Sequence, residues 1–470
     1  MLFSSMIFLW LFLPFVLVVN LFLPVRPGNG FLLVMSLIFY AWGEQEYIWL
    51  LALSLAVNYA GAIGIGTARD GGAHSLARWL LILAVGVNLG FLGYFKYFDF
   101  AAGLLAKAAG RRLIEPGNLM LPVGISFYTF QMISYVADVY RGDIPAERNL
   151  LNLGLYISFF PKMIQGPIER YKGMGACIRS RHVTPEAFAW GARRFIYGLG
   201  KKVILANQFG SVVDKALAHP MEQISGGLGW LSGILYALQI YYDFSGYSDM
   251  AVGLGGMLGF ELTENFNYPY LAKSVGEFWR RWHISLSGWF KDYLYIPLGG
   301  SRRGTLITCR NLMIVFFCTG FWHGAGLSFM AWGLYYGVLQ AAERLFLKKR
   351  LERLPAAVSY LYMFVVTVAG WTMFRADSLT RGICLLKQMF LFSPGIYDVS
   401  MYMTHKTTVY MLIGFALCGP IQALAPGIAR HMRQDRKVYL GESLGLILLF
   451  AYSMAMAVGS TYNPFIYFRF

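Results

Sequence analysis

The amino-acid sequence predicts an all-α protein that crosses a membrane many times. Of its 470 residues, 57% are hydrophobic and 14% are charged, and its mean hydropathy is +0.51. A soluble protein carries roughly 25% charged residues, so much of the charge that keeps a soluble surface in water is missing. Long runs without Asp, Glu, Lys or Arg support the same fold class. Together these observations exclude a DNA-binding protein, a secreted disulfide scaffold and a disordered chain.

Eight charge-free runs are long enough to span a bilayer, because a helix needs about 20 apolar residues to cross the hydrocarbon core. These runs are 1–25, 47–68, 116–137, 223–242, 311–342, 354–374, 407–429 and 443–468. Shorter runs, which predict tilted, interfacial or re-entrant helices, are 31–43, 79–95, 149–161, 203–213 and 250–260. We expect about 11 spans. The first run is expected to be a span and not a cleaved signal peptide, since no Lys or Arg precedes Arg26.

The net charge of +16 is carried by loops between the apolar runs. The segments rich in Lys and Arg are 162–202, 343–353 and 430–437. The positive-inside rule places all three in the cytoplasm. Runs 354–374 and 407–429 then form an out-and-back pair, which leaves 375–406 outside.

Two stretches, 138–202 and 261–310, are too apolar for free loops and too charged for spans, so they predict amphipathic or re-entrant helices. Non-helical backbone at membrane depth is tolerated only when it is buried in protein or lines a cavity, so a cavity is expected. No linker separates a soluble domain. The whole chain, 1–470, is therefore expected to form one membrane-embedded domain, with its core motifs in about 116–345 and further helices in 354–468.

A histidine lies in the middle of the longest charge-free run, 311–342. This run is longer than one span and too short for two full spans with a turn. Gly320, Gly324 and Gly326 each lower helix stability by up to about 1 kcal/mol, so a helix break is expected at His323. An ionisable group inside a membrane segment is a functional-site hypothesis, and imidazole can act as a general base near neutral pH. The alternative is a neutral histidine that is hydrogen-bonded between helices.

A second histidine, His283, lies in an aromatic and charged segment, 277–293. If this segment is one helix, Trp279, His283, Leu286 and Phe290 share a face. Such a helix could belong to an active site. It could equally anchor the protein at the membrane interface, where Trp and Arg are common.

The polar cluster 241–249 follows directly on an apolar run. Its two acids and its hydroxyl groups could orient a base or bind a hydroxylated acceptor. The alternative is a polar helix terminus capped by Asp243 or Ser245. The five cysteines are scattered, and neither Cys-x-x-Cys nor His-x-x-x-His occurs, so no metal site and no disulfide framework is expected.

Five blocks of residues resemble a known family in their order and spacing. They are 121–130, 242–251, 264–267, 277–295 and 321–325. The sequence resembles the membrane-bound O-acyltransferase superfamily in its bacterial polysaccharide branch, which contains the membrane subunits of alginate and peptidoglycan O-acetyltransferases. The resemblance covers about residues 1–345. Its most specific parts are Phe-Trp-Arg-Arg-Trp-His-Ile-Ser-Leu-Ser from Phe278 and Trp-His-Gly-Ala from Trp322.

This resemblance implies a bundle of about 11 transmembrane helices, with re-entrant and interfacial helices around a central funnel. It implies acetyl-CoA as a cytoplasmic acyl donor, with no permanently bound cofactor. It also implies an acceptor on the outer side of a bacterial cytoplasmic membrane. A separate extracytoplasmic protein would transfer the acetyl group to a polysaccharide, and membrane lipids would surround the chain. No nucleic acid is expected as a partner.

The essential histidine of the superfamily corresponds to His323, and a supporting position corresponds to His283. We therefore expect these two residues to be catalytic, with His323 as the base. The expected supporting or substrate-binding residues are Asp243, Ser245, Trp322, Trp282 and Asn265. Two other functions stay open at this point. One is a polysaccharide or lipid transporter, which is disfavoured because no internal symmetry is visible. The other is a sister acyltransferase that moves D-alanine from a carrier protein.

Overall fold

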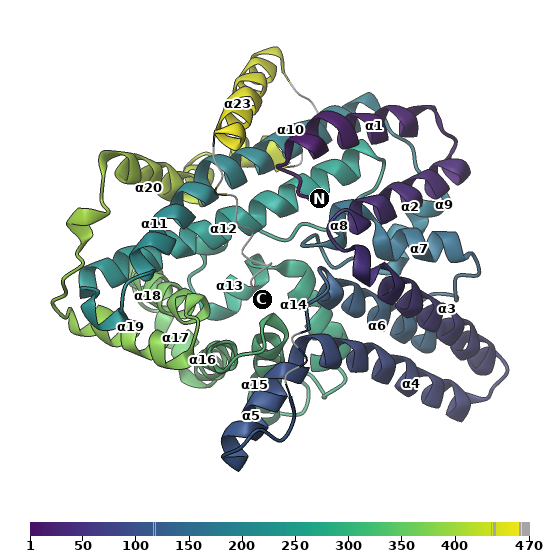
Figure 1. Cartoon of the computed structure of the whole chain (residues 1–470), viewed down its shortest axis with the longest axis horizontal. Coiled ribbons are helices and arrows are strands. Elements are labelled where there is room, and N and C mark those ends of the chain that lie inside the picture. The colour runs from purple at the N-terminus through teal and green to yellow at the C-terminus, as the bar shows by residue number, and fades with distance from the viewer. Residues whose placement is uncertain (116, 118, 434, 436–438, 460–461, 463–470) are drawn as a thin grey trace. The chain divides into compact units, whose positions relative to one another are not determined.

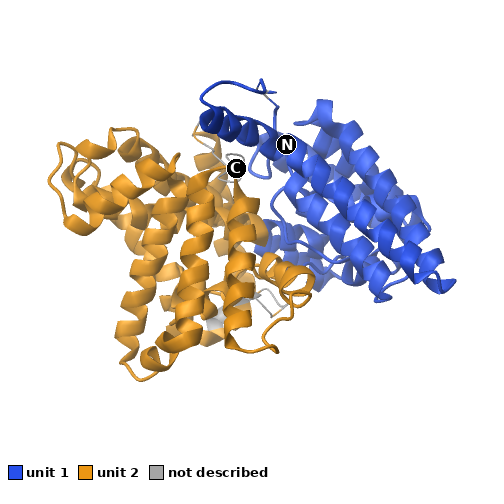
Figure 2. Ribbon diagram, turned by 90° about the horizontal axis from the view of Figure 1, so that it is seen from below, with its two compact units in different colours: residues 1–195, 250–263, 436–438 blue, residues 196–249, 264–435, 439–470 orange. Residues whose placement is uncertain are grey.

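The structure is a computed structural model that describes residues 1–115, 117, 119–433, 435, 439–459 and 462. Every named element in this part of the chain is a helix, and one isolated bridge pairs Ile224 with Tyr397 (Figure 1). The chain divides into two compact units (Figure 2). Unit 1 contains Met1–Phe195 and Met250–Thr263, and unit 2 contains Ile196–Asp249 and Glu264–Asp435 with the segment that begins at Tyr439.

Unit 1 is built mainly from the first half of the chain. Its helices are α1 (Leu13–Phe22), α2 (Val25–Ala41), α3 (Ile48–Asp70), α4 (His74–Leu92), α5 (Phe98–Ala109), α6 (Ile125–Arg141), α7 (Leu150–Ser158), α8 (Phe160–Met163), α9 (Tyr171–Arg179) and most of α10 (Pro185–Gly200). Helices α3, α4 and α6 pack together, and the side-chain amides of Asn58 and Asn88 donate to each other at 3.0 and 2.8 Å. Such polar pairs hold neighbouring helices together in a membrane.

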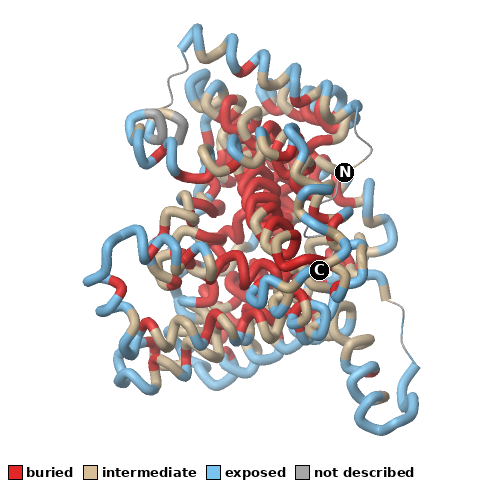
Figure 3. Tube along the Cα trace, turned by 90° about the vertical axis from the view of Figure 1, so that its left-hand side faces the viewer, coloured by how far each residue is buried: buried red, intermediate tan, exposed pale blue. Residues whose placement is uncertain are grey.

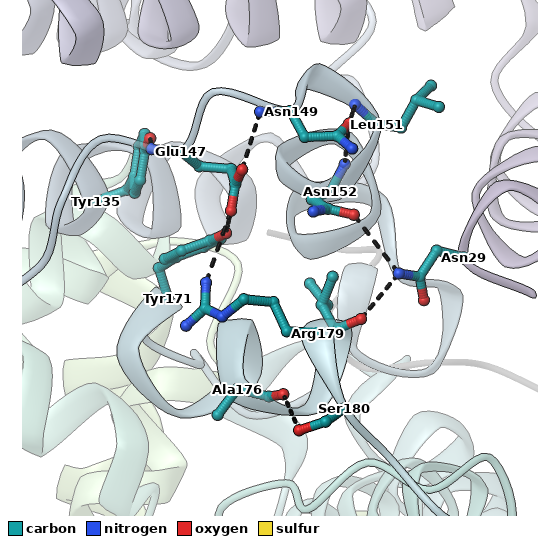
Figure 4. Close-up of polar contacts among 11 residues, drawn as sticks. Asn29, Tyr135, Glu147, Asn149, Leu151, Asn152, Tyr171, Ala176, Arg179 and Ser180 are labelled. Carbon is teal, nitrogen blue, oxygen red and sulfur yellow. Dashed lines mark hydrogen bonds and ion pairs between the residues drawn. The ribbon is translucent and has the colours of Figure 1, made fainter. Parts of the chain in front are cut away.

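A second polar network connects α2, α7 and α9 of unit 1 (Figure 4). The Asn29 amide donates to the Ile178 carbonyl at 2.8 Å, and the Tyr171 hydroxyl donates to the Glu147 carboxylate. Arg179 lies 3.7 Å from the same carboxylate. The stretch 138–202, expected to form amphipathic or re-entrant helices, therefore contains short helices that are held by polar contacts.

Unit 2 carries the segments that the sequence analysis selected for chemistry. Its helices are α11 (Asn207–Leu217), the greater part of α12 (Gly226–Met257), α13 (Val275–Arg281), α14 (Ile284–Phe290), α15 (Thr305–His323), α16 (Leu327–Ala342), α17 (Lys348–Leu351), α18 (Ala356–Arg375), α19 (Leu379–Leu391), α20 (His405–Leu417), α21 (Pro420–Leu424), α22 (Pro426–Arg433) and α23 (Leu440–Val458). Buried and exposed residues are distinguished along the trace in Figure 3. Helix α12 is buried along nearly all of its length.

Within the described residues, six helical segments are long and apolar enough to cross a membrane. They are Gln45–Asp70, His74–Ala109, Thr305–His323, Ala356–Arg375, His405–Leu424 and Leu440–Val458. The first predicted span is helical over Phe8–Phe22 only, and Val25–Ala41 is also shorter than a full crossing. The chain is thus a helical membrane protein. The total of about 11 spans stays a prediction, and the end of run 443–468 lies outside the described residues.

Burial corrects one part of the charge analysis. The segment 162–202 was assigned to loops, but several of its cations are buried. Lys162, Arg193 and Lys202 are fully buried, and Arg194 is 4% exposed. Arg193, Arg194 and Lys202 lie on the helical stretch that α10, the π-helix η4 (Lys201–Ala206) and α11 form, so the end of this basic segment is helix and not loop.

Candidate active site

His323 is the last residue of α15, at the tip of a helical hairpin. Gly324 follows in an extended conformation, with φ −167° and ψ 152°, and α16 begins at Leu327. The helix break that the glycines predicted at His323 is therefore confirmed. The break places the imidazole where two antiparallel helices meet and not on the flank of a single helix.

Two glycines allow these helices to cross closely. A Cβ at Gly320 would lie 2.3 Å from the Phe329 carbonyl oxygen, and a Cβ at Gly333 would lie 2.3 Å from the Phe316 carbonyl oxygen. The two glycine Cα atoms thus face each other across the α15–α16 contact, where no larger residue fits. Small residues at such crossings let helix backbones approach in a membrane. The hairpin that holds His323 is consequently fixed by backbone contact.

The His323 ring is buried among aromatic side chains. It is 5% exposed, and its centroid lies 4.9 Å from that of Trp322, 5.3 Å from that of Trp332 and 5.2 Å from that of Phe374. The rings of Trp332 and Phe374 are nearly perpendicular to the imidazole. These contacts come from α15, α16 and α18, so three helices fix the orientation of the imidazole.

His283 does not lie on a helix, which corrects the sequence analysis. Helix α13 ends at Arg281 and α14 begins at Ile284, and His283 has φ +45° and ψ 56°. The predicted common face of Trp279, His283, Leu286 and Phe290 therefore does not exist as one helical stripe. His283 is instead the N-cap residue of α14, in a left-handed conformation that is uncommon for residues other than glycine.

Asn265 explains why the helix breaks there. Its carbonyl oxygen accepts the Ile284 N–H at 3.0 Å, and its Oδ1 accepts the Ser285 N–H at 3.1 Å and the Ser285 hydroxyl at 2.7 Å. The first two backbone N–H groups of α14 are satisfied in this way from a residue about 20 positions earlier. Asn265 is fully buried. It was expected as a supporting residue, and the structure shows that it holds the His283 turn.

The same Asn265 oxygen determines which nitrogen of His283 carries a proton. His283 Nδ1 lies 3.4 Å from Asn265 Oδ1, and the two donors from Ser285 identify that atom as an oxygen. Nδ1 is therefore the donor, and Nε2 carries the lone pair. His283 is 1% exposed, and this burial lowers its pKa, so the ring is neutral. Within the described part of the chain, Nε2 has no hydrogen-bond partner.

One indole lies between the two histidines. The Trp322 centroid is 4.9 Å from that of His323 and 6.3 Å from that of His283. His283 also packs edge-on against Phe244 of α12, with the ring centroids 4.7 Å apart. The two histidines that the sequence analysis selected, 40 positions apart in the chain, are thus brought to one aromatic cluster.

Trp282 belongs to the same cluster. Its centroid lies 4.7 Å from that of Trp371 and 5.0 Å from that of Phe266. Trp371 in turn lies 5.5 Å from Phe374, which contacts His323. Trp282 is 2% exposed, so it acts here as part of the wall that joins the two histidine segments.

Asp243 and Ser245 lie inside α12, so their interpretation as caps of a helix terminus is wrong. The helix continues through the polar cluster, and Asp243 forms an ion pair with Lys202 of η4 in which both side chains are 1% exposed. Lys201 and Asp249 form a neighbouring pair at 2.5 Å. Lys202 was not among the predicted site residues, because it lies in a basic segment that the charge distribution assigns to loops. Ser245 is 2% exposed, and its hydroxyl has no partner among the described residues.

A cavity of about 340 Å³ lies among the helices that carry the two histidines, although neither histidine lines it. It is lined by residues of α13, α14, α15 and α16 and of the π-helix η7 (Lys291–Tyr295). The cavity expected for the stretch 261–310 is thus present. Its lining includes Arg280 and Lys291, both exposed, and Thr319, which lies one helical turn before His323. In the part of the chain that the structure describes, no three His, Cys, Asp or Glu side chains are grouped to hold a metal.

Several known proteins are similar to this chain. Residues 144–376, which contain every residue of the site, match the model of the membrane-bound O-acyltransferase family. A Pseudomonas putida protein named "Probable alginate O-acetylase AlgI" is 38% identical over the full length of both chains. The Helicobacter pylori peptidoglycan O-acetyltransferase is 31% identical over all of this chain and 98% of its own length. A Bacillus subtilis teichoic acid D-alanyltransferase is 30% identical over 51% of this chain and 64% of its own. The chain is a member of the membrane-bound O-acyltransferase family.

Proposed function

We propose that this acyltransferase takes acetyl groups from cytoplasmic acetyl-CoA and passes them across a bacterial cytoplasmic membrane for O-acetylation of an extracytoplasmic polysaccharide. The observation that carries the proposal is the pair of buried histidines around Trp322. The relatives named as alginate and peptidoglycan O-acetyltransferases support acetyl as the acyl group. A separate extracytoplasmic protein would receive the acetyl group and transfer it to the polymer.

The cavity among the helices that carry the two histidines supports a donor of the acetyl-CoA type. Arg280 and Lys291 place two cations among its lining residues, where they would offset the charge of the donor phosphates. The rest of the lining is largely apolar, which suits the pantetheine arm. Two lining residues are close to the histidines along the chain: Thr319 lies one helical turn before His323 on α15, and Ile284 follows His283 directly.

Acyl transfer to a hydroxyl needs a base that removes the hydroxyl proton. We assign this role to His323. The acceptor oxygen attacks the thioester carbonyl as His323 takes the proton, and collapse of the tetrahedral intermediate releases the CoA thiolate, which recovers that proton. A well-positioned base contributes about 10²- to 10⁴-fold to the rate. His283 Nε2, whose lone pair Asn265 leaves free, would accept a hydrogen bond from the substrate.

The test measures acetyl transfer by the purified full-length protein. Detergent-solubilised protein is incubated with radiolabelled acetyl-CoA, and released or transferred label is counted. We expect turnover in the wild type and a fall of at least 100-fold in His323→Ala. The matched control is His405→Ala, because His405 is an exposed histidine at the start of α20. Transfer at the wild-type rate by a folded, membrane-inserted His323→Ala protein would contradict the proposal.

The same assay distinguishes acetyl-CoA from the other candidate acyl donor. The likeness to a teichoic acid D-alanyltransferase makes a D-alanyl carrier protein the competing acyl source. Wild-type turnover with the carrier protein and none with acetyl-CoA would replace acetyl by D-alanine and keep His323 as the base. Turnover with neither donor, together with movement of polymer across a vesicle membrane, would favour a transporter.

A further inference from the structure

Unit 2 contains a second cavity that the acyl-transfer site does not use. It has a volume of about 530 Å³ and is lined by α12, α13, α18, α20, α21 and the 3₁₀ helix η6 (Pro269–Leu271). Its inner wall includes Tyr270 and Phe278, whose rings also pack against Trp282 at 6.3 and 5.6 Å. The cavity is thus separated by one layer of aromatic side chains from the cluster that holds the two histidines.

Most polar atoms in the lining are already hydrogen-bonded within the protein. The Tyr270 hydroxyl donates to the Ala237 carbonyl at 2.5 Å, and the Thr367 hydroxyl donates to the Met363 carbonyl at 2.6 Å. The Cys418 thiol lies 3.2 Å from the Phe415 carbonyl oxygen. These polar atoms are already hydrogen-bonded within the protein, and most other lining residues are apolar. A cavity of this kind stays dry and favours hydrocarbon.

The rim of the cavity is exposed on helices that are long and apolar enough to cross a membrane. Leu424 is 87% exposed, Tyr360 is 41% exposed and Phe364 is 36% exposed. These residues belong to α18 and α21, which lie within the candidate spans Ala356–Arg375 and His405–Leu424. Exposed apolar side chains on such helices face lipid tails, so the cavity is open to the bilayer.

A cation lies at one end of this rim. Lys273 is exposed, and its Nζ lies 5.5 Å from the ring centroid of Tyr360. The backbone beside it is fixed, because the Lys273 N–H donates to the Glu277 carboxylate at 3.0 Å and the Val275 N–H donates to the Glu343 carboxylate at 2.6 Å. The backbone of Lys273 is therefore fixed, and its ammonium group lies over the ring of Tyr360, a lining residue of the cavity.

The same contacts place Lys273 on one side of the membrane. Glu343 follows α16 directly and starts the basic segment 343–353, which the charge distribution assigns to the cytoplasm. The Tyr362 hydroxyl, on the first turns of α18, also lies 3.3 Å from the Glu343 carboxylate. Lys273 is thus level with the cytoplasmic ends of α16 and α18, which is the depth of the lipid headgroups in the inner leaflet.

We propose that this cavity is a binding site for an anionic phospholipid of the cytoplasmic leaflet. One acyl chain occupies the cavity between α12, α18 and α20–α21, and the phosphate pairs with Lys273. Basic groups beside cavities between membrane helices on the cytoplasmic side are suited to anionic headgroups, and each cation near the membrane surface contributes about 1 kcal/mol. The apolar cavity provides affinity for a lipid chain, and Lys273 provides the preference for a negative charge.

The test measures lipid affinity directly and does not depend on acetyl transfer. Delipidated full-length protein in detergent is titrated with phosphatidylglycerol or with phosphatidylcholine of the same acyl chains, and bound lipid is counted by native mass spectrometry. For the wild type we expect about fivefold tighter binding of phosphatidylglycerol. Lys273→Gln should abolish this preference. The matched control is Lys406→Gln, since Lys406 is an exposed lysine over a tyrosine ring at the other end of α20, 5.9 Å from Tyr410.

A second variant tests the cavity itself. Ala423 lines the cavity and is exposed, so Ala423→Phe fills the space without disturbing the core, and we expect it to weaken both lipids. If Lys273→Gln and Lys406→Gln preferred phosphatidylglycerol over phosphatidylcholine to the same extent, the assignment of Lys273 to the lipid phosphate would be overturned. Unchanged lipid binding by Ala423→Phe would overturn the cavity assignment. The assignment would also fail if Ala423→Phe changed the oligomeric mass of the protein without changing the amount of retained lipid, because a second copy of the chain would then be the occupant.

Discussion

The two histidine segments of the site reach the same aromatic cluster by different routes. The α15–α16 hairpin is specified locally, because Gly320, Gly324 and Gly326 weaken the helix around His323 itself. The α13–α14 turn is specified at a distance, because Asn265 supplies the acceptors that start α14 after His283. The first break is visible in the sequence and the second is not. A site residue can thus be located by a pattern, whereas its backbone geometry depends on a partner far along the chain.

The largest effect is expected from a variant that obstructs the close crossing of α15 and α16 at Gly320. Gly320→Val places a side chain against the Phe329 carbonyl oxygen, where even a Cβ would be at 2.3 Å. Overpacking typically costs about 1–3 kcal/mol, and a backbone obstacle places this variant at or above the upper end. We expect a large drop in the thermal unfolding temperature together with loss of acetyl transfer.

The control for this variant lies in the same hairpin. A Cβ at Gly326 would find its nearest atom at 3.5 Å, so Gly326→Ala should unfold close to the wild type. Equal unfolding temperatures for the two variants would mean that the close crossing of α15 and α16 does not stabilise the hairpin.

Removing the side-chain acceptor that Asn265 supplies to the start of α14 should have the next largest effect. Asn265→Ala deprives the Ser285 N–H and hydroxyl of their shared acceptor, and a buried donor left without a partner costs about 1–3 kcal/mol. We expect a lower unfolding temperature and a lower kcat, because the His283 ring loses its Nδ1 acceptor. Ser285→Ala removes only one bond to that acceptor and should lose about 1 kcal/mol. The role of Asn265 would be refuted if both variants had the same stability and the same kcat.

Two substitutions of His283 distinguish the contribution of its backbone conformation to stability from the contribution of its imidazole to activity, and the expected difference in stability is smaller. Asn tolerates the left-handed conformation better than Ala does, so His283→Asn should be about 1 kcal/mol more stable than His283→Ala. Both variants lack the imidazole and should show reduced acetyl transfer. Unfolding by denaturant measures the first expectation and the radiolabel assay the second. Wild-type kcat in His283→Asn would show that the turn matters and the ring does not.

The sequence predicts the fold class and the helix break at His323, but it does not reveal several of the contacts around the candidate site. Composition and charge-free runs identify a helical membrane protein, and the glycines around His323 identify the hairpin break. The ion pair between Lys202 and Asp243 could not be predicted from the sequence, because the two residues are 41 positions apart and Lys202 lies in a segment that resembles a cytoplasmic loop. Burial of such cations depends on tertiary packing, and a charge count does not register it.

The smallest effect concerns a second residue in the left-handed conformation. Phe392 ends α19 with φ +49°, and its side chain is 74% exposed. Glycine adopts this conformation without a steric cost, so Phe392→Gly should raise stability by about 0.5–1 kcal/mol and leave acetyl transfer unchanged. Denaturant unfolding and the radiolabel assay measure the two outcomes. If Phe392→Gly is destabilising, the Phe392 ring contributes packing that outweighs its backbone strain. At His283 the left-handed conformation is buried and is fixed by Asn265. The protein tolerates its steric cost there because this conformation orients the ring nitrogens of His283.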